Sequence, residues 1–200
     1  NVLKVAKSQD KISLTIDDNK YANWFAKKYG NTLTDEDALF ATYCLYYANI
    51  DSNILPYYTS GDAATWVATL KGTKFYHDVA DYSPEAGDLV IWTSGSETKI
   101  GVLIEVLYGT SPRVVRATAA TQWNAGQVGE DTIWNVSEIV GYVEIPKGKL
   151  TYSEDGVLSA TATYEYGKIP EGTNLVVQLL EANAAWDNLL KDDLASIDKG

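Results

Sequence analysis

The stretch that most constrains how this chain folds is TLTDEDALFATYCLYYANI, residues 32–50. Thr34 is a suitable helix N-cap, and Asp37, three residues later, completes a pair like a capping box in a first turn rich in carboxylates. The residues that follow are apolar on most sides of the helix: Leu39, Phe40, Tyr43, Tyr46 and Tyr47. A helix of this kind must be covered nearly all round. The sequence therefore predicts a central, buried helix that packs against a sheet.

Helical spacing of apolar residues predicts two short helices over 2–9 and 17–31. Another helix is expected to begin near Ser60 or Asp62 and to end at Gly72. After it the period changes to that of strands, which we expect within 83–93, 98–109, 111–120, 131–136 and 138–146. Helices followed by an antiparallel meander indicate the α+β class, with N-terminal helices packed on an antiparallel sheet.

The pattern resets at Pro146, so we expect a domain over 1–146 and a small unit over 147–200. The second unit is predicted to hold a β-hairpin, a further strand and an amphipathic helix over 182–200. Residues 151–200 include nine acidic and three basic side chains, so they carry −6 of the total charge of −11. Three strands and one helix make a thin core. We interpret this unit as the start of a further module or as an appendage.

Composition excludes several classes of function. A net charge of −11 argues against binding to nucleic acid or to an anionic bilayer, because these need clustered Lys and Arg. No stretch is long and apolar enough to span a membrane, and the charged first twenty residues are no signal peptide. The absence of methionine predicts a chain cut from a longer precursor. One cysteine and one histidine do not make a structural zinc site, and we expect neither a metal nor a cofactor.

The order of segments over most of 1–146 resembles the CHAP domains (cysteine, histidine-dependent amidohydrolases and peptidases), relatives of the NlpC/P60 peptidases with a papain-like fold. FATYCLYYANI continues the central helix in the manner of that family. PEAGDLVIW looks like the family's Pro-x-x-Gly-Asp-Leu-Val strand, and KIGVLIEV looks like its His-Val-Gly-Ile-Val strand. The resemblance implies a papain-like fold and an amidase or endopeptidase that acts on peptidoglycan.

The chain departs from that family at each catalytic position. The resemblance places the nucleophilic cysteine at Asp37, the histidine at Lys99 and the residue that orients the histidine near Arg116. A carboxylate at a helix N-terminus is stabilised but is a poor nucleophile toward an amide. A lysine beside a carboxylate stays protonated and cannot act as a general base. We expect an ion pair between Asp37 and Lys99 in a site without activity, and a helix-capping role for Asp37 is equally compatible with the sequence.

Other residues with reactive or binding side chains leave alternatives open. Cys44 lies two turns beyond Asp37 on nearly the same helix face, and His77 is the one histidine, so a Cys44 and His77 pair is a candidate dyad. A buried, inert thiol and a surface histidine are the favoured interpretations. Consecutive carboxylates at 35–37 point in different directions and favour helix capping over a metal site. Trp123, in the TQWNAG segment, is the candidate for a surface aromatic that binds a ligand.

These observations favour a catalytically inactive CHAP-like domain of a bacterial secreted or surface protein, with a binding or scaffold role at the cell wall. Asp37, Lys99 and Trp123 are the candidate binding residues, and peptidoglycan or another cell-surface molecule is the expected partner. A divergent peptidoglycan hydrolase that uses Cys44 or another nucleophile is the alternative among enzymes. A structural spacer or adhesive module is the alternative among non-enzymes.

Overall fold

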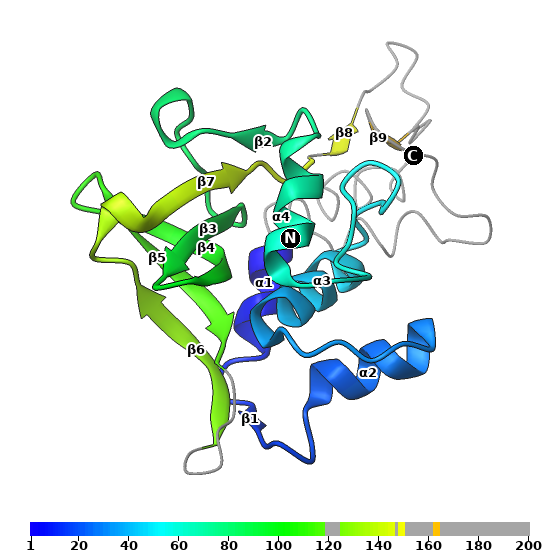
Figure 1. Cartoon of the computed structure of the whole chain (residues 1–200). Helices are drawn as coiled ribbons and strands as arrows, with labels where there is room; N and C mark the ends of the chain where they lie inside the picture. Colours follow the sequence, from blue (N-terminus) through cyan, green and yellow to red (C-terminus); the bar gives the residue numbers. More distant parts are fainter. Residues whose placement is uncertain (119–124, 147, 151–161, 165–200) are drawn as a thin grey trace, which may run out of the picture. The chain divides into compact units, whose positions relative to one another are not determined.

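The computed structural model describes residues 1–118, 125–146, 148–150 and 162–164 (Figure 1). The chain divides into two units, which are described separately: one is Val2–Pro146 and the other is Lys147–Gly200 together with Asn1. Trp123 and the helix expected over 182–200 lie outside the described residues. In the second unit, β8 (Gly148–Leu150) pairs antiparallel with β9 (Ala162–Tyr164).

The first unit holds four described helices and a seven-stranded antiparallel sheet, so the chain is an α+β protein. The helices are α1 (Val2–Ser8), α2 (Lys20–Tyr29), α3 (Glu36–Tyr47) and α4 (Ala63–Lys71). Figure 1 shows the helices on one side of the sheet. The helix α3 contacts α1, α2, β4 and β5, so it occupies the central position that its apolar sequence predicts.

Local signals account for the ends of α2 and α4. The side chain of Asn19 accepts hydrogen bonds from the amides of Tyr21 and Ala22 at the start of α2, and Gly30, with φ of 69°, ends it. The side chain of Asp62 accepts from the amide of Thr65 and caps α4, as the sequence predicts.

The N-terminus of α3 differs from the prediction. Asp35 is the N-cap residue, and the expected cap at Thr34 is wrong. The Asp35 carboxylate makes no hydrogen bond within α3 and accepts one from the amide of Ala63 at 2.6 Å. Asp35 therefore joins the first turn of α4 to the first turn of α3, which is a tertiary contact and not a local cap.

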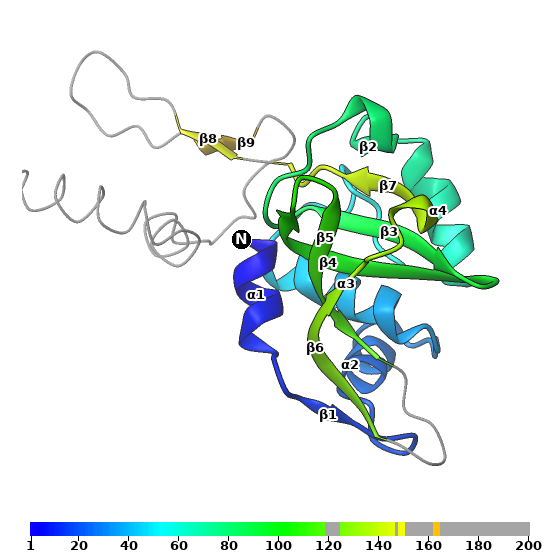
Figure 2. The same ribbon diagram turned by 90° about the vertical axis from the view of Figure 1, so that its left-hand side faces the viewer.

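The strand order in the sheet is β1-β6-β5-β4-β3-β7-β2. Figure 2 shows the sheet after a turn of 90° from the view of Figure 1. Its strands are β1 (Ser13–Leu14), β2 (Tyr76–His77), β3 (Leu89–Ser94), β4 (Glu97–Leu107), β5 (Ser111–Ala117), β6 (Gly126–Thr132) and β7 (Ile139–Val143). The strands β3 to β6 form a meander, and β7 returns to pair with the free side of β3. Register shifts in β3 and β4 mark irregularities of the β-bulge type, which bend a sheet.

The strand predicted over 131–136 is displaced. The strand β6 ends at Thr132, and Trp134 beyond it is 66% exposed. Strand propensity of Ile133, Trp134 and Val136 suggested the later position, but pairing with β5 and β1 decides the observed one.

Asp88 organises the loop that precedes β3. This carboxylate is 2% exposed and accepts hydrogen bonds from the hydroxyl of Tyr82 and from the amides of Glu85 and Ile145. A buried carboxylate is tolerated when donors surround it. Asp88 thereby fixes the segment before β3 and the end of β7, which gives the PEAGDLV motif a structural role.

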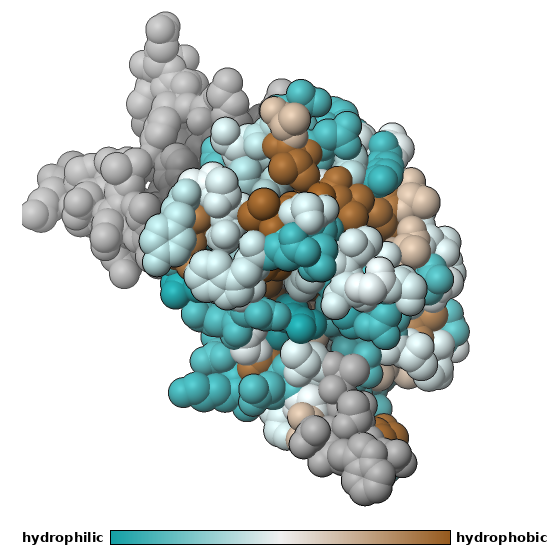
Figure 3. All heavy atoms as spheres, turned by 60° about the vertical axis from the view of Figure 1, so that its left-hand side comes forward, coloured by the Kyte–Doolittle hydropathy of each residue, from teal (hydrophilic) through white to brown (hydrophobic). Residues whose placement is uncertain are grey.

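A cluster of buried hydrophobic residues joins β3, β4, β5 and β7. Trp92, Val114, Leu103 and Tyr142 belong to it, and Tyr82 packs against it. Gly101 packs closely against this cluster. A Cβ atom added at Gly101 would lie only 2.8 Å from the side chain of Val114. On the face seen in Figure 3, hydrophobic residues form a patch bordered by hydrophilic ones (Figure 3).

Candidate functional site

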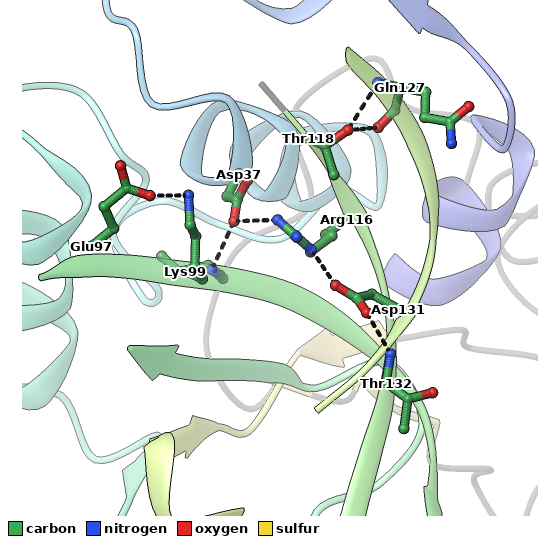
Figure 4. Close-up of polar contacts among 9 residues, drawn as sticks. Asp37, Glu97, Lys99, Arg116, Thr118, Gln127, Asp131 and Thr132 are labelled. Atoms are coloured by element: carbon green, nitrogen blue, oxygen red, sulfur yellow. Dashed lines mark hydrogen bonds and ion pairs between the residues drawn. The ribbon is translucent and has the colours of Figure 1, made fainter. Parts of the chain in front are cut away.

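Three residues that the sequence singled out meet at the N-terminal end of α3 (Figure 4). Asp37 comes from the first turn of α3, Lys99 from β4 and Arg116 from β5. Asp37 is buried, with 6% of the whole residue exposed, and its Oδ2 atom lies 3.4 Å from Nη1 of Arg116. The same oxygen accepts a hydrogen bond from the amide of Ile100 at 3.4 Å. The fold thus brings together three side chains that are far apart in the sequence.

The amide of Ile100 is available because the ladder between β4 and β5 ends before it. The last paired residues at that end are Val102 and Val115. Amides of successive residues point to opposite sides of a strand, and the amide of Leu103 bonds to Asp88 on the β3 side. The amide of Ile100 therefore points toward the β5 side, where the carboxylate of Asp37 takes the place of a strand carbonyl.

Arg116 bridges two carboxylates. Its Nε atom lies 2.9 Å from Oδ2 of Asp131 on β6, in addition to the contact with Asp37. The guanidinium lies over the ring of Trp92, 5.6 Å from its centroid. Such a stacked position suits arginine, because its planar charge is weakly hydrated. We call Asp37, Arg116 and Asp131 the Asp37 cluster.

The prediction that Asp37 forms an ion pair with Lys99 is wrong. Lys99 Nζ lies 2.8 Å from Oε2 of Glu97, its neighbour two residues earlier on the same strand. Among the described residues, the ion pair of Asp37 is with Arg116. Lys99 still acts at a distance, since its charge favours the ionised form of Asp37.

The electrostatics of the Asp37 cluster are set by burial. Burial raises the pKa of Asp37 to about 6, although Arg116, Lys99 and the amide of Ile100 oppose the rise. Burial also raises the pKa of the neighbouring Glu36. Near neutral pH the Asp37 carboxyl can therefore hold or release a proton, but it faces a guanidinium and an amide, and neither of these is a base that could activate a nucleophile.

Cys44 and His77 are placed in different surroundings. Cys44 is fully buried on α3, and burial raises the pKa of its thiol well above its ordinary value. His77 is on β2, where its Nε2 atom lies 3.1 Å from Oε2 of Glu144 and its ring stacks on Tyr82 at 4.1 Å. A thiol without water access and with a raised pKa is a poor nucleophile. The favoured interpretation of Cys44 as an inert thiol agrees with this geometry.

Sequence reasoning missed Asp131 and Trp92 as parts of the site. Asp131 lies in the strand predicted over 131–136, which the structure places earlier in the chain, and Trp92 lies in the strand predicted over 83–93 without a signal of its own. The alternation of side chains along β5 is the signal that could have indicated them. It places Val114 and Arg116 on one face of the strand, and a charged residue on such a face needs an opposite charge nearby. Among the described residues, no group of His, Cys, Asp and Glu is arranged to hold a metal ion.

No protein-family model, no curated protein and no solved structure matches the chain. None of the helices in the described ranges has the length and apolar character needed to cross a bilayer.

Proposed function

We propose that this chain carries a papain-like, CHAP-related domain that has lost catalysis and that binds or scaffolds at a bacterial cell surface. The observation that carries the proposal is the meeting of Asp37, Lys99 and Arg116 at the N-terminus of α3. These are the positions where the resemblance puts a cysteine, a histidine and the residue that orients the histidine. Three positions chosen by resemblance come from three separate elements, so their proximity supports the relationship.

The chemistry of the cluster supports the loss of activity. Amide hydrolysis of this type needs a thiolate and a base in contact. Asp37 supplies a carboxylate that is nearly inaccessible, with 8% of its side chain exposed, and the guanidinium of Arg116 is a hydrogen-bond donor with no acceptor. Only 18% of the Arg116 side chain and 23% of the Lys99 side chain are exposed. The former site would therefore serve to join α3 to the sheet.

A divergent hydrolase that uses Cys44 is not favoured by this geometry. Its nucleophile is fully buried, and the ring of His77 is occupied by Tyr82 and Glu144. A spacer or adhesive role is compatible with the inactive domain and differs from it only in the partner. We therefore take binding to peptidoglycan as the form of the proposal to test.

The test uses purified peptidoglycan with the wild-type chain and with Cys44→Ala as a matched variant. We expect no soluble muropeptides from either protein by reversed-phase chromatography, because neither contains an activated nucleophile. We also expect both to sediment with the polymer. Muropeptide release that disappears in Cys44→Ala would establish the enzyme alternative. If neither protein releases muropeptides or sediments with peptidoglycan, the binding role at the cell wall is wrong.

A further inference from the structure

Two aromatic side chains stand exposed at adjoining connections of the sheet. Tyr108, in the turn between β4 and β5, is 88% exposed, and Trp134, after β6, is 66% exposed. Their rings are nearly parallel, with an angle of 28° and centroids 6.5 Å apart. At that separation the rings are offset, so each keeps a large uncovered face. Neither ring contributes much to the core, and together they form a platform that faces solvent.

The backbone of the hairpin holds Tyr108 outward. The turn runs from Leu107 to Thr110 and is closed by a hydrogen bond from the amide of Thr110 to the carbonyl of Leu107 at 3.0 Å. Tyr108 has φ of 51° and Gly109 has φ of 76°. Asn or Gly is the usual choice at the first of these positions, because side chains with a bulky Cβ are disfavoured there. The chain thus keeps a tyrosine at a strained position where its ring makes little contact with the core, and such strain occurs often at binding sites.

Trp134 is also fixed by its neighbours. Ile133 is 5% exposed, and its amide donates to the carbonyl of Pro112 on β5 at 2.9 Å. On the other side, the carbonyl of Trp134 accepts from the amide of Val136 at 3.2 Å. The two rings are therefore presented by anchored backbone, which reduces the entropy lost when a ligand binds.

Polar side chains adjoin the platform. Asn135 donates to the carboxylate of Glu138 at 3.0 Å and accepts from the hydroxyl of Ser137 at 2.7 Å, and both contacts are exposed. An aromatic face next to amide, carboxylate and hydroxyl groups matches a sugar, whose rings have an apolar C–H face and a rim of hydroxyls. This combination occurs here within five consecutive residues of the chain, 134–138.

We propose that Tyr108 and Trp134 form a binding platform for a neutral, β-linked polysaccharide. In β-linked glucose or N-acetylglucosamine the hydroxyls and amide are equatorial, so the flat C–H face is free to lie on an aromatic ring. The charge of −11 disfavours polyanionic partners such as nucleic acids or sulfated glycans. A stable protein interface buries more than about 1,000 Å² in total, and two rings cover too little area for one. The inference rests on residues outside the Asp37 cluster, so it does not depend on the proposed function.

The experiment is calorimetric titration of the whole chain with chitohexaose and, separately, with cellohexaose. The variants are Trp134→Ala and Tyr108→Asn, in which asparagine suits the backbone of the turn. Tyr47→Ala is the matched control, because Tyr47 is a 53% exposed tyrosine on α3. We expect the wild type and Tyr47→Ala to bind at least one of the two sugars equally well. Each platform variant should bind at least tenfold more weakly while keeping its circular dichroism spectrum.

Two results would overturn the inference. One is the absence of wild-type binding to both sugars at millimolar concentration. Another is equal affinity of the wild type and Trp134→Ala for the sugar that binds. If no sugar binds and the wild type, but not the platform variants, binds neutral phosphatidylcholine vesicles, the rings belong to a lipid-binding surface instead.

Discussion

Asp37 is a carboxyl group that water scarcely reaches, and its ionisation is therefore linked to the stability of the fold. Its pKa is raised from a usual value of 3.8 to about 6, mainly by burial. Its acceptor contacts with Arg116 and Ile100 are both 3.4 Å, which is long for a charge-assisted hydrogen bond. Arg116 is held more closely by Asp131, at 2.9 Å, so Asp37 receives only part of the compensation that a buried charge requires.

The first prediction at this scale concerns pH. Because the folded state binds the Asp37 proton more tightly than the unfolded state, the contribution of Asp37 to the free energy of unfolding is largest below pH 4. It should fall as the pH rises through 6, by about 3 kcal/mol in total at 1.4 kcal/mol per pKa unit. We expect the wild type to lose this stability relative to Asp37→Asn, whose amide stays neutral. Urea denaturation of both proteins from pH 4 to pH 8 measures the difference, and other titrating groups cancel in it. A difference that is independent of pH, or that rises with pH, would show that the carboxyl is not held as described.

Among the elements, β4 carries most of the constraints on the site. It supplies Lys99 and the amide of Ile100. Gly101 follows them on the same strand. An added Cβ at Gly101 would lie 2.8 Å from Val114 Cγ2 and 3.4 Å from the ring of Trp92. Trp92 in turn supports the guanidinium of Arg116. The packing of β4 against β5 thus sets where Arg116 can lie.

We therefore predict that Gly101→Ala lowers the free energy of unfolding by about 1 to 3 kcal/mol, the usual cost of overpacking. Gly129→Ala on β6 is the matched control, because nothing lies within 4 Å of a Cβ there. The control should be neutral or slightly stabilising, since alanine loses less entropy on folding than glycine. Urea denaturation of the two variants gives the comparison. Equal stability of the two variants would contradict the packing described for Gly101.

Features that depend on interactions between residues close in the sequence could be predicted. Features that depend on contacts between distant residues could not. The ends of α2 and α4 were predictable, because Asn19, Gly30, Asp62 and Gly72 act on neighbours within a few residues. The N-cap of α3 was not, because the Asp35 side chain bonds to Ala63, 28 residues away. The two-residue strands β1 and β2 carry too few residues to show a period of two, and only their partners β6 and β7 define them.

The candidate site shows the same limit. Asp37, Lys99 and Arg116 are singled out by resemblance; Asp37 and Arg116 are in contact, and Lys99 is close enough for its charge to act on Asp37. The choice of partner for Asp37 was wrong, because it depends on the end of the β4–β5 ladder at Val102 and on the position of Glu97 beside Lys99. Neither could be read from the sequence.

For the first unit as a whole, the Asp37 cluster connects the helical layer to the sheet. Asp37 belongs to the central helix, Arg116 to β5 and Asp131 to β6, so one arginine holds three elements together. At the positions where the CHAP resemblance expects catalytic residues, Asp37 forms a structural contact with Arg116 and not with Lys99. A contact of this kind has a coupling energy that can be measured without any ligand.

The most direct test is a pair of double-mutant cycles in urea denaturation at pH 8, where Asp37 is ionised. One cycle combines Asp37→Asn with Arg116→Met, and the control cycle combines Asp37→Asn with Lys99→Met. We predict a coupling of about 1 to 3 kcal/mol between Asp37 and Arg116, in the range for residues in one network, and a smaller value between Asp37 and Lys99. A coupling below about 0.3 kcal/mol for Asp37 and Arg116, or a larger one for Lys99, would contradict the account.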